Sequence, residues 1–128
     1  MSNLVVSNIS DGTTSVEFAA FNDYQNRATR LVIYRDEERI IYPALGLASE
    51  AGEVLSKIKK QLRDFGPTAR FSPEANWAIA DEIGDVLWYL AALCHDLGTP
   101  LEVVAARNLE KLNSRLERGV LGGSGDNR

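Results

Sequence analysis

Apolar residues recur along the chain at intervals of three and four residues, which is the spacing of one face of an α-helix. One such stripe runs through residues 44–62 and comprises Ala44, Ala48, Ala51, Leu55, Ile58 and Leu62. A second runs through residues 101–116 and comprises Leu101, Ala105, Leu109, Leu112 and Leu116. No stretch alternates with the period of two that marks a half-buried strand. The pattern therefore predicts an all-α protein.

Start signals divide the chain into four helices. Residues 14–17, Thr-Ser-Val-Glu, form a capping box that predicts a first helix running to about residue 34, with Phe21, Tyr24, Ala28 and Leu31 on its apolar face. Pro43 fits the first turn of a second helix, since proline is favoured there. We expect that helix to run until the break at residues 63–72, where Gly and Pro mark a turn.

The last two helices have signals at both ends. Ser72 followed by Pro73 predicts a capped start for the third, and Gly98 its end. Residues 99–102, Thr-Pro-Leu-Glu, form a capping box that predicts the start of the fourth, and Gly119 ends it. Four helices in one short chain favour a bundle-like arrangement.

The third predicted helix is apolar on nearly every side between residues 83 and 93. A helix without a polar face is covered on every side. A chain of 128 residues has little other material to cover it. This helix therefore predicts an interface in a homo-oligomer.

Length and composition indicate one soluble globular domain, because 45% of the residues are hydrophobic and 25% charged. We expect a flexible arm at residues 1–13, the helical domain at 14–119 and a flexible tail at 120–128. The net charge of −4 argues against a general nucleic-acid binder. No run of 18 apolar residues or signal peptide is apparent, and the single Cys94 suits a reducing compartment, so we expect a cytoplasmic protein without a membrane partner.

Two pairs of acidic residues carry the candidate chemistry. Glu50 and Glu53 are three residues apart in the second helix, and Glu82 and Asp85 are three apart in the third. Residues at this spacing share a helix face. Glu50, Glu53 and Lys57 fall on the flank of the apolar stripe, where side chains line a crevice between packed helices. Two such helices side by side would direct four carboxylates at one point.

Four adjacent carboxylates predict a bound cation. Two like charges about 4 Å apart repel by roughly 4 kcal/mol at an effective dielectric constant near 20, so the cluster takes up protons or binds a metal ion. Oxygen ligands favour Mg²⁺, with Mn²⁺ second, and protein-bound Mg²⁺ commonly accepts substrate phosphate oxygens. A di-iron site needs Glu-x-x-His pairs, and His95 has no such partner. The competing interpretation of each acidic pair is a solvated helix face.

Several further side chains are candidates for substrate binding. Asn108, Lys111 and Arg115 share a face of the fourth helix and would hold phosphates, although a solvated basic face explains them equally well. Lys57 either contacts phosphate or pairs with Glu53 at i+4. Tyr89 lies one turn beyond Asp85 and either offers its hydroxyl to a phosphate or packs in the core. The aromatic residues that either stack on a base or belong to the core are Phe21, Tyr24, Trp77 and Trp88.

The acidic motifs and their surroundings resemble those of the MazG-like, all-α nucleoside triphosphate pyrophosphohydrolases, a family that includes dimeric dUTPases and dCTP pyrophosphatases. The signature is E-x-x-E followed after a spacer by E-x-x-D. Here it reads Glu50-x-x-Glu53, 28 intervening residues, and Glu82-x-x-Asp85. The flanking segments LGLASEAGEV and DEIGDVLWYL fit, as does Asn108-x-x-Lys111. The match extends over about residues 18–118.

The resemblance implies cleavage of a nucleoside triphosphate between its α and β phosphates, giving the monophosphate and pyrophosphate. It also implies nucleotide-pool house-cleaning and a dimer or tetramer in which two subunits build each site. The four acids would hold Mg²⁺, and Glu50 or, by preference, Glu53 would activate water. Lys57, Tyr89, Asn108 and Lys111 would contact phosphate or sugar. The chain lacks the tandem arrangement of longer MazG proteins, so a regulatory role known for those does not follow.

Two rival functions are compatible with the same residues. A nucleotide-sensing or helical dimerisation module would keep the acids without performing hydrolysis, and would be stabilised by Mg²⁺ and nucleotide with no product formed. A purely structural bundle would respond to neither ligand. The sequence alone does not identify the base, or distinguish ribose from deoxyribose.

Overall fold

The computed structural model describes residues 20–124, in which every regular element is a helix and no strand occurs. The elements in order are α1 (Phe21–Ala28), the 3₁₀ turns η1 (Thr29–Leu31) and η2 (Asp36–Glu38), α2 (Ile41–Phe65), α3 (Pro73–Asp96) and α4 (Leu101–Glu117). This confirms the all-α fold with four α-helices. The predicted arm at residues 1–13 and the capping box at residues 14–17 lie outside the described residues.

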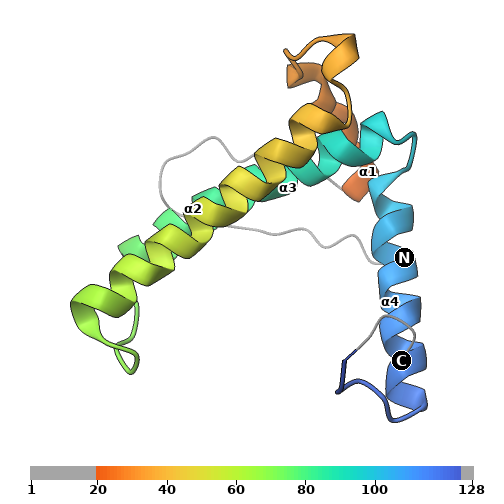
Figure 1. Ribbon diagram of the computed structural model, residues 1–128. Coiled ribbons are helices and arrows are strands. Elements are labelled where there is room, and N and C mark those ends of the chain that lie inside the picture. The colour runs from red at the N-terminus through yellow and green to blue at the C-terminus, as the bar shows by residue number, and fades with distance from the viewer. Residues whose placement is uncertain (1–19, 125–128) are drawn as a thin grey trace.

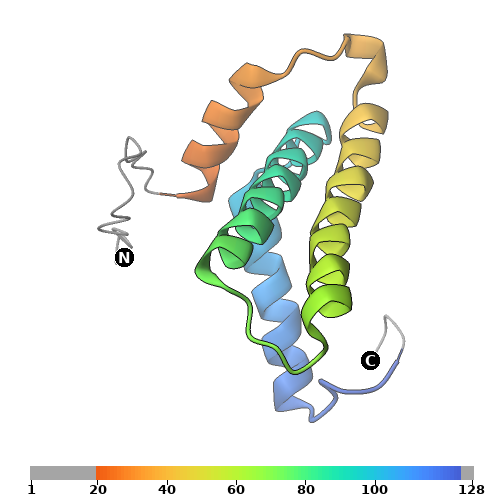
Figure 2. The ribbon, with the colours of Figure 1, turned by 90° about the vertical axis from the view of Figure 1, so that its left-hand side faces the viewer.

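The two long helices α2 and α3 form an antiparallel hairpin, which is the most extensive helix–helix contact in the described chain (Figures 1 and 2). Pro43 lies in the first turn of α2, as predicted. Ser72 caps α3 as predicted, because its side-chain oxygen accepts a hydrogen bond from the Ala75 N–H at 3.1 Å. Gly98 has the positive φ of a residue that ends a helix. The sequence signals therefore locate this hairpin well.

The face of α2 that packs on α3 differs from the apolar stripe read in the sequence. The partly or fully buried positions of α2 include Pro43, Leu47, Glu50, Val54, Lys57 and Gln61, again spaced by four and three, with Gly46 and Ser56 beside them. The stripe from Ala44 to Leu62 is instead exposed, with Leu55 at 66% and Leu62 at 50% of full exposure. Glu50 and Lys57 thus lie on the contact face itself, and the Ala/Leu stripe is a second apolar face that residues 20–124 do not cover.

Asp96, at the end of α3, fixes the beginning of α2. Its Oδ2 accepts hydrogen bonds from the Tyr34 hydroxyl and from the Ile40 N–H, both at 3.0 Å. Ile40 immediately precedes α2 and has a φ of 67°, which is unfavourable for a branched residue. The carboxylate therefore holds a strained residue and brings negative charge to the N-terminus of α2.

The first helix is shorter than predicted. α1 begins at Phe21 and ends at Ala28, where the sequence suggested an end near residue 34. The Thr29 hydroxyl bonds back to the Gln25 carbonyl at 2.9 Å, and the backbone is extended by Val32. A hydroxyl that competes for helix carbonyls, followed by branched residues, disfavours continuation of the helix.

A small core joins α1, α3 and α4. Ala28, Ala91 and Leu101 are buried there, with Tyr24, Trp88 and Cys94 packed around them. The Trp88 indole N–H donates to the Ala28 carbonyl at 3.2 Å. This core attaches α1 and α4 to the C-terminal half of α3.

The start of α4 corrects the predicted capping box at Thr99. Pro100 occupies the N-cap position, and the capping side chains come from α1. The Leu101 N–H donates to Gln25 Oε1 at 2.9 Å, and the Glu102 N–H donates to Asn22 Oδ1 at 3.2 Å. These are the free N–H groups of a first helical turn, satisfied from a distant segment. α4 ends at Glu117 before Gly119, as expected.

Beyond its first turn α4 diverges from the α2–α3 hairpin (Figure 1). Leu109 and Leu116 are 60% and 61% exposed, so the predicted stripe of α4 is uncovered over much of its length. α3 shows the same feature at Ile83, which is 53% exposed although it lies in the segment that is apolar on nearly every side. None of the described helices has both the length and the apolar content needed to cross a lipid bilayer.

Candidate functional site

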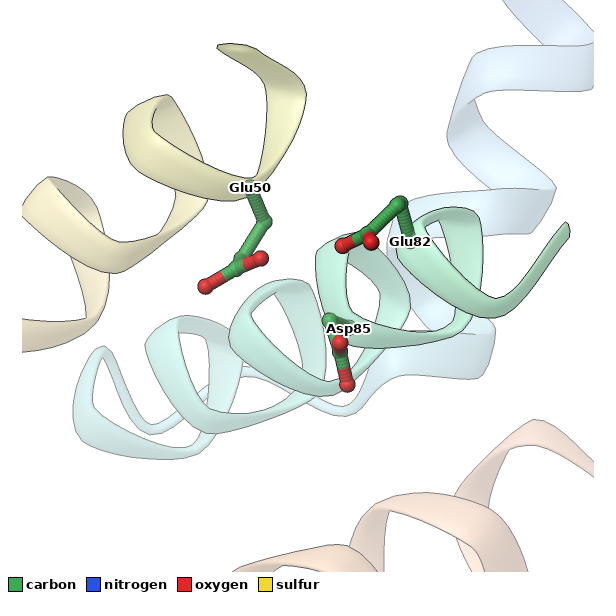
Figure 3. Close-up of side chains that lie close together, drawn as sticks. All are labelled: Glu50, Glu82 and Asp85. Atoms are coloured by element: carbon green, nitrogen blue, oxygen red, sulfur yellow. The ribbon is translucent and has the colours of Figure 1, made fainter. Parts of the chain in front are cut away.

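Three carboxylates from two helices meet in the α2–α3 hairpin. Glu50 belongs to α2, and Glu82 and Asp85 belong to α3; one carboxylate oxygen of each lies within 4.8 Å of those of the other two. Figure 3 shows Glu50 directed towards α3 and Glu82 pointing back towards it. Glu50 and Glu82 are partly buried, and Asp85 is exposed. Acids that are about 30 residues apart in sequence therefore converge.

A close contact one turn before Glu50 sets the separation of the two helices. At Gly46 of α2 a Cβ atom would overlap the ring of Tyr89 on α3. Glycine is thus required for the backbone of α2 to approach this ring. The contact lies one turn beyond Asp85 on α3, so it holds the two acid-bearing faces at carboxylate-to-carboxylate distance.

The cluster has the electrostatics of a cation site. Partial burial, followed by repulsion from Asp85, Glu82 and Glu53, raises the pKa of Glu50. A cation of the chain already lies against the cluster, since Lys57 Nζ is 3.1 Å from Glu82 Oε1. Three carboxylates against one ammonium leave an excess of negative charge. Oxygen-only donors at this spacing fit a hard divalent ion such as Mg²⁺.

The fourth predicted acid, Glu53, is not a member of this cluster. Its side chain is exposed, although its charge is close enough to contribute to the raised pKa of Glu50. The reason is the packing face of α2, which centres on Glu50 and Lys57 and turns Glu53 towards solvent. The structure therefore brings together three of the four predicted acids and leaves Glu53 at the edge.

Tyr89 extends the site towards the beginning of α2. Burial, the neighbouring Tyr42 and the charge of Glu50 raise the pKa of Tyr89. The ring of Tyr42 stacks on that of Tyr34 with centroids 5.1 Å apart. Tyr42 was missed in the sequence, although its i, i+4 spacing with Gly46 and Glu50 puts the three on one helix face.

A second tyrosine lies on the other side of α3. Burial, and then the charge of Asp85, raise the pKa of Tyr24 on α1. Asp85 is therefore flanked by an aromatic residue of α1 as well as by the acids. Tyr24 and Trp88 also pack against the core of α1, α3 and α4, as one of the two sequence interpretations held.

The remaining candidates lie in α4, in the first turns of α3 and in α1. Asn108, Lys111 and Arg115 belong to the part of α4 that diverges from the hairpin (Figure 1). Trp77 is on the first turns of α3 with 55% of its surface exposed, and Phe21 is 50% exposed on α1. Of the predicted substrate contacts, the structure brings Lys57 and Tyr89 to the cluster, and it does not bring the α4 residues there.

Comparison with known proteins agrees with this geometry. The model of the MazG nucleotide pyrophosphohydrolase domain matches residues 43–120, which include all four acidic residues of the two motifs. The chain is 46% identical over 91 residues to Gene 37 protein of Mycobacterium phage L5, a match that covers 71% of this chain and 78% of the phage protein. No solved structure matches the chain significantly. The chain belongs to the MazG nucleotide pyrophosphohydrolase domain family.

Proposed function

We propose that this protein is a Mg²⁺-dependent nucleoside triphosphate pyrophosphohydrolase that cleaves between the α and β phosphates. The observation that carries the proposal is the convergence of Glu50, Glu82 and Asp85 from two helices. Family membership supports a nucleotide substrate and pyrophosphate as the product. Mn²⁺ would serve as a substitute ion, because it has similar oxygen-ligand preferences.

Each acidic residue has a role in this scheme. Glu50, Glu82 and Asp85 hold the Mg²⁺, which when bound neutralises charge on the phosphate oxygens and polarises the phosphorus they surround. Glu53, exposed at the edge of the cluster, is the residue to orient and deprotonate the attacking water. The water oxygen forms a new bond to phosphorus, the bridging bond between the α and β phosphates breaks, and the proton passes to the Glu53 carboxylate.

Substrate binding requires cations in addition to the acids. Lys57 and Tyr89 are available beside the cluster in the same chain. For Asn108, Lys111 and Arg115 we propose that α4 of a second copy brings them to the phosphates. The exposed apolar stripes of α2 and α4 support an obligate homo-oligomer, a dimer or a dimer of dimers, since so many uncovered leucines are unusual on a monomer. Trp77 is a further candidate for contact with the nucleotide.

The biological role that follows is nucleotide-pool house-cleaning, the removal of surplus or damaged nucleoside triphosphates. The chemistry described above acts on the triphosphate and does not depend on the base. Selection of the base must therefore come from side chains around the cluster.

The direct test is chromatographic separation of the products from a panel of canonical and modified nucleoside triphosphates. We expect Mg²⁺-dependent formation of monophosphate and pyrophosphate from at least one of them. Glu50→Gln and Asp85→Asn each remove a proposed Mg²⁺ ligand and should lower turnover by about 10²-fold or more with unchanged helical circular dichroism. Release of orthophosphate instead of pyrophosphate would contradict the proposed bond cleavage. Nucleotide-induced thermal stabilisation without any product would assign the chain to a sensing module.

A further inference from the structure

Lys57 of α2 forms an ion pair with Glu82 of α3. Its Nζ lies 3.1 Å from Glu82 Oε1, so the pair joins α2 to α3, and the two side chains are only 33% and 19% exposed. Three other ion pairs in the described part join residues one to four positions apart on exposed surfaces. Lys57–Glu82 is thus a partly desolvated contact between the two helices that carry the acids.

The acceptor in this pair is also a member of the carboxylate cluster. Glu82 lies with Glu50 and Asp85 in the group whose oxygens approach within 4.8 Å. An ammonium at 3.1 Å from Glu82 uses the same carboxylate charge that would attract a metal ion. A lysine and a divalent cation also repel each other at such distances. Occupation of Glu82 by Lys57 and binding of a metal ion there therefore oppose each other.

Once its contact with Glu82 is broken, the Lys57 ammonium can reach other positions near the cluster. Lysine has a flexible four-carbon stem with three rotatable donors, so its charge can move several ångströms without any change in the backbone. Lys57 is one turn beyond Glu53 on α2, and Glu53 is exposed to solvent. A phosphate chain bound to a metal ion in the cluster would present its negative oxygens at this edge.

We propose that Lys57 is the resident counter-cation of the acidic cluster, displaced from Glu82 by the metal ion and so freed to bind substrate phosphate. The phosphate half of this inference rests on the proposed function; the exchange of cations does not. The exchange keeps the cluster partly neutralised before the metal arrives, and it supplies a phosphate contact only once the metal is in place. Lys57 is accordingly a substrate-binding residue whose contact with phosphate depends on metal occupancy.

The test is Mn²⁺ binding to the metal-free full-length protein in the absence of nucleotide, measured by isothermal titration calorimetry and electron paramagnetic resonance. Lys57→Met keeps the length of the side chain and removes the competitor, so we expect at least a fivefold lower Kd for Mn²⁺ than in the wild type. Lys57→Arg retains the positive charge beside Glu82 and should therefore not bind Mn²⁺ more tightly than the wild type. Lys60→Met, an exposed lysine one turn on, controls for the general loss of a positive charge from α2.

Nucleotide binding should change in the opposite direction. With Mn²⁺ saturating, an α,β-methylene nucleoside triphosphate should bind Lys57→Met at least fivefold more weakly than the wild type. If the Lys57–Glu82 ion pair had only a structural role, Lys57→Met would weaken the binding of both Mn²⁺ and the nucleotide. Mn²⁺ affinity in Lys57→Met equal to or below that of the wild type would overturn the exchange, whereas tighter Mn²⁺ with no turnover of any nucleotide in the wild type would overturn only the proposed function.

Nuclear magnetic resonance of the wild-type protein tests the displacement of Lys57 without relying on a variant that could fail to fold. The ¹⁵N resonance of the Lys57 side chain should move towards that of an exposed lysine when Mg²⁺ is added to the metal-free protein. A Lys57 resonance that remains unchanged through metal saturation would contradict the displacement.

Discussion

At the scale of single residues, the site depends on which side of α2 each acid occupies. Glu50 and Glu53 are three residues apart, yet Glu50 is partly buried against α3 and Glu53 is exposed. The difference arises because the packed face is centred on Glu50, Val54 and Lys57, so that Glu53 lies on its rim. Two acids of one motif therefore have different environments, which suits the division between holding a metal ion and activating water.

This division makes Glu53→Gln an informative variant. We expect turnover to fall by 10²- to 10⁴-fold, the usual contribution of a general base. The Kd for Mn²⁺ should stay within a few-fold of that of the wild type, because Glu53 is outside the cluster of three. Steady-state kinetics and calorimetry measure the two quantities. Loss of metal affinity as large as that in Asp85→Asn would make Glu53 a ligand instead.

A second residue-scale prediction concerns Tyr34. Burial, the hydrogen bond to Asp96 and the charge of Asp96 raise the pKa of Tyr34 from 10.0 to about 12. A group whose pKa is raised by folding stabilises the protein fully below the unfolded value, and this stabilisation is lost as the pH rises towards the folded value. Between pH 10 and 12 the free energy of unfolding should therefore fall more steeply in the wild type than in Tyr34→Phe, as measured by urea unfolding. Parallel curves would show that the Tyr34–Asp96 bond is absent in solution.

At the scale of helices, local signals in the sequence locate the element boundaries that local chemistry determines. Ser72, Gly98 and Gly119 mark the ends of α3 and α4 because capping and positive φ depend on neighbours in sequence. The predicted cap of α4 was wrong because the side chains that cap this helix, Gln25 and Asn22, are more than 70 residues away in sequence. The predicted packing face of α2 was wrong because the more apolar stripe is the one left exposed by the described residues. Periodicity shows that a face is apolar without showing what covers it.

The long-range cap of α4 gives a stability prediction. Gln25 is 6% exposed and makes three hydrogen bonds, to the carbonyls of Ala91 and Thr99 and from the Leu101 N–H. Gln25→Ala leaves that buried N–H without a partner, so we expect a loss of about 1–3 kcal/mol in the free energy of unfolding. Asn26→Ala, at the exposed neighbouring residue, is the control and should change the free energy of unfolding by less than about 0.5 kcal/mol. Urea titrations at one protein concentration would measure both, and equal effects would contradict a capping role for Gln25.

At the scale of the whole molecule, one chain contains the acids but not the complete set of predicted phosphate contacts near them. The acid pairs were predictable because the i, i+3 spacing and the family motif are local in sequence. The position of α4 was not, because periodicity puts Ala28 and Leu101 on apolar faces without showing that they meet Ala91 in one core. The proposed oligomer accounts for both the uncovered apolar stripes and the distance between α4 and the acids.

Subunit mixing tests whether a second copy completes the site. Glu82→Gln removes an acid and Lys111→Ala removes an α4 cation, so each variant alone should have little activity. Hybrid dimers contain one site with both residues intact, and random mixing should restore about a quarter of wild-type turnover. A mixture no more active than its components after co-refolding would place Lys111 and the acids of each site in the same chain.

The most direct measurement of the central claim is Mn²⁺ binding to the triple variant Glu50→Gln/Glu82→Gln/Asp85→Asn by calorimetry, beside the wild type. Glu102→Gln, an exposed acid at the start of α4, is the matched control. We expect the wild type and the control to bind Mn²⁺ with the same affinity, and the triple variant to show no binding at that site while keeping its helical content. Undiminished binding in the folded triple variant would contradict a metal site formed by these three carboxylates.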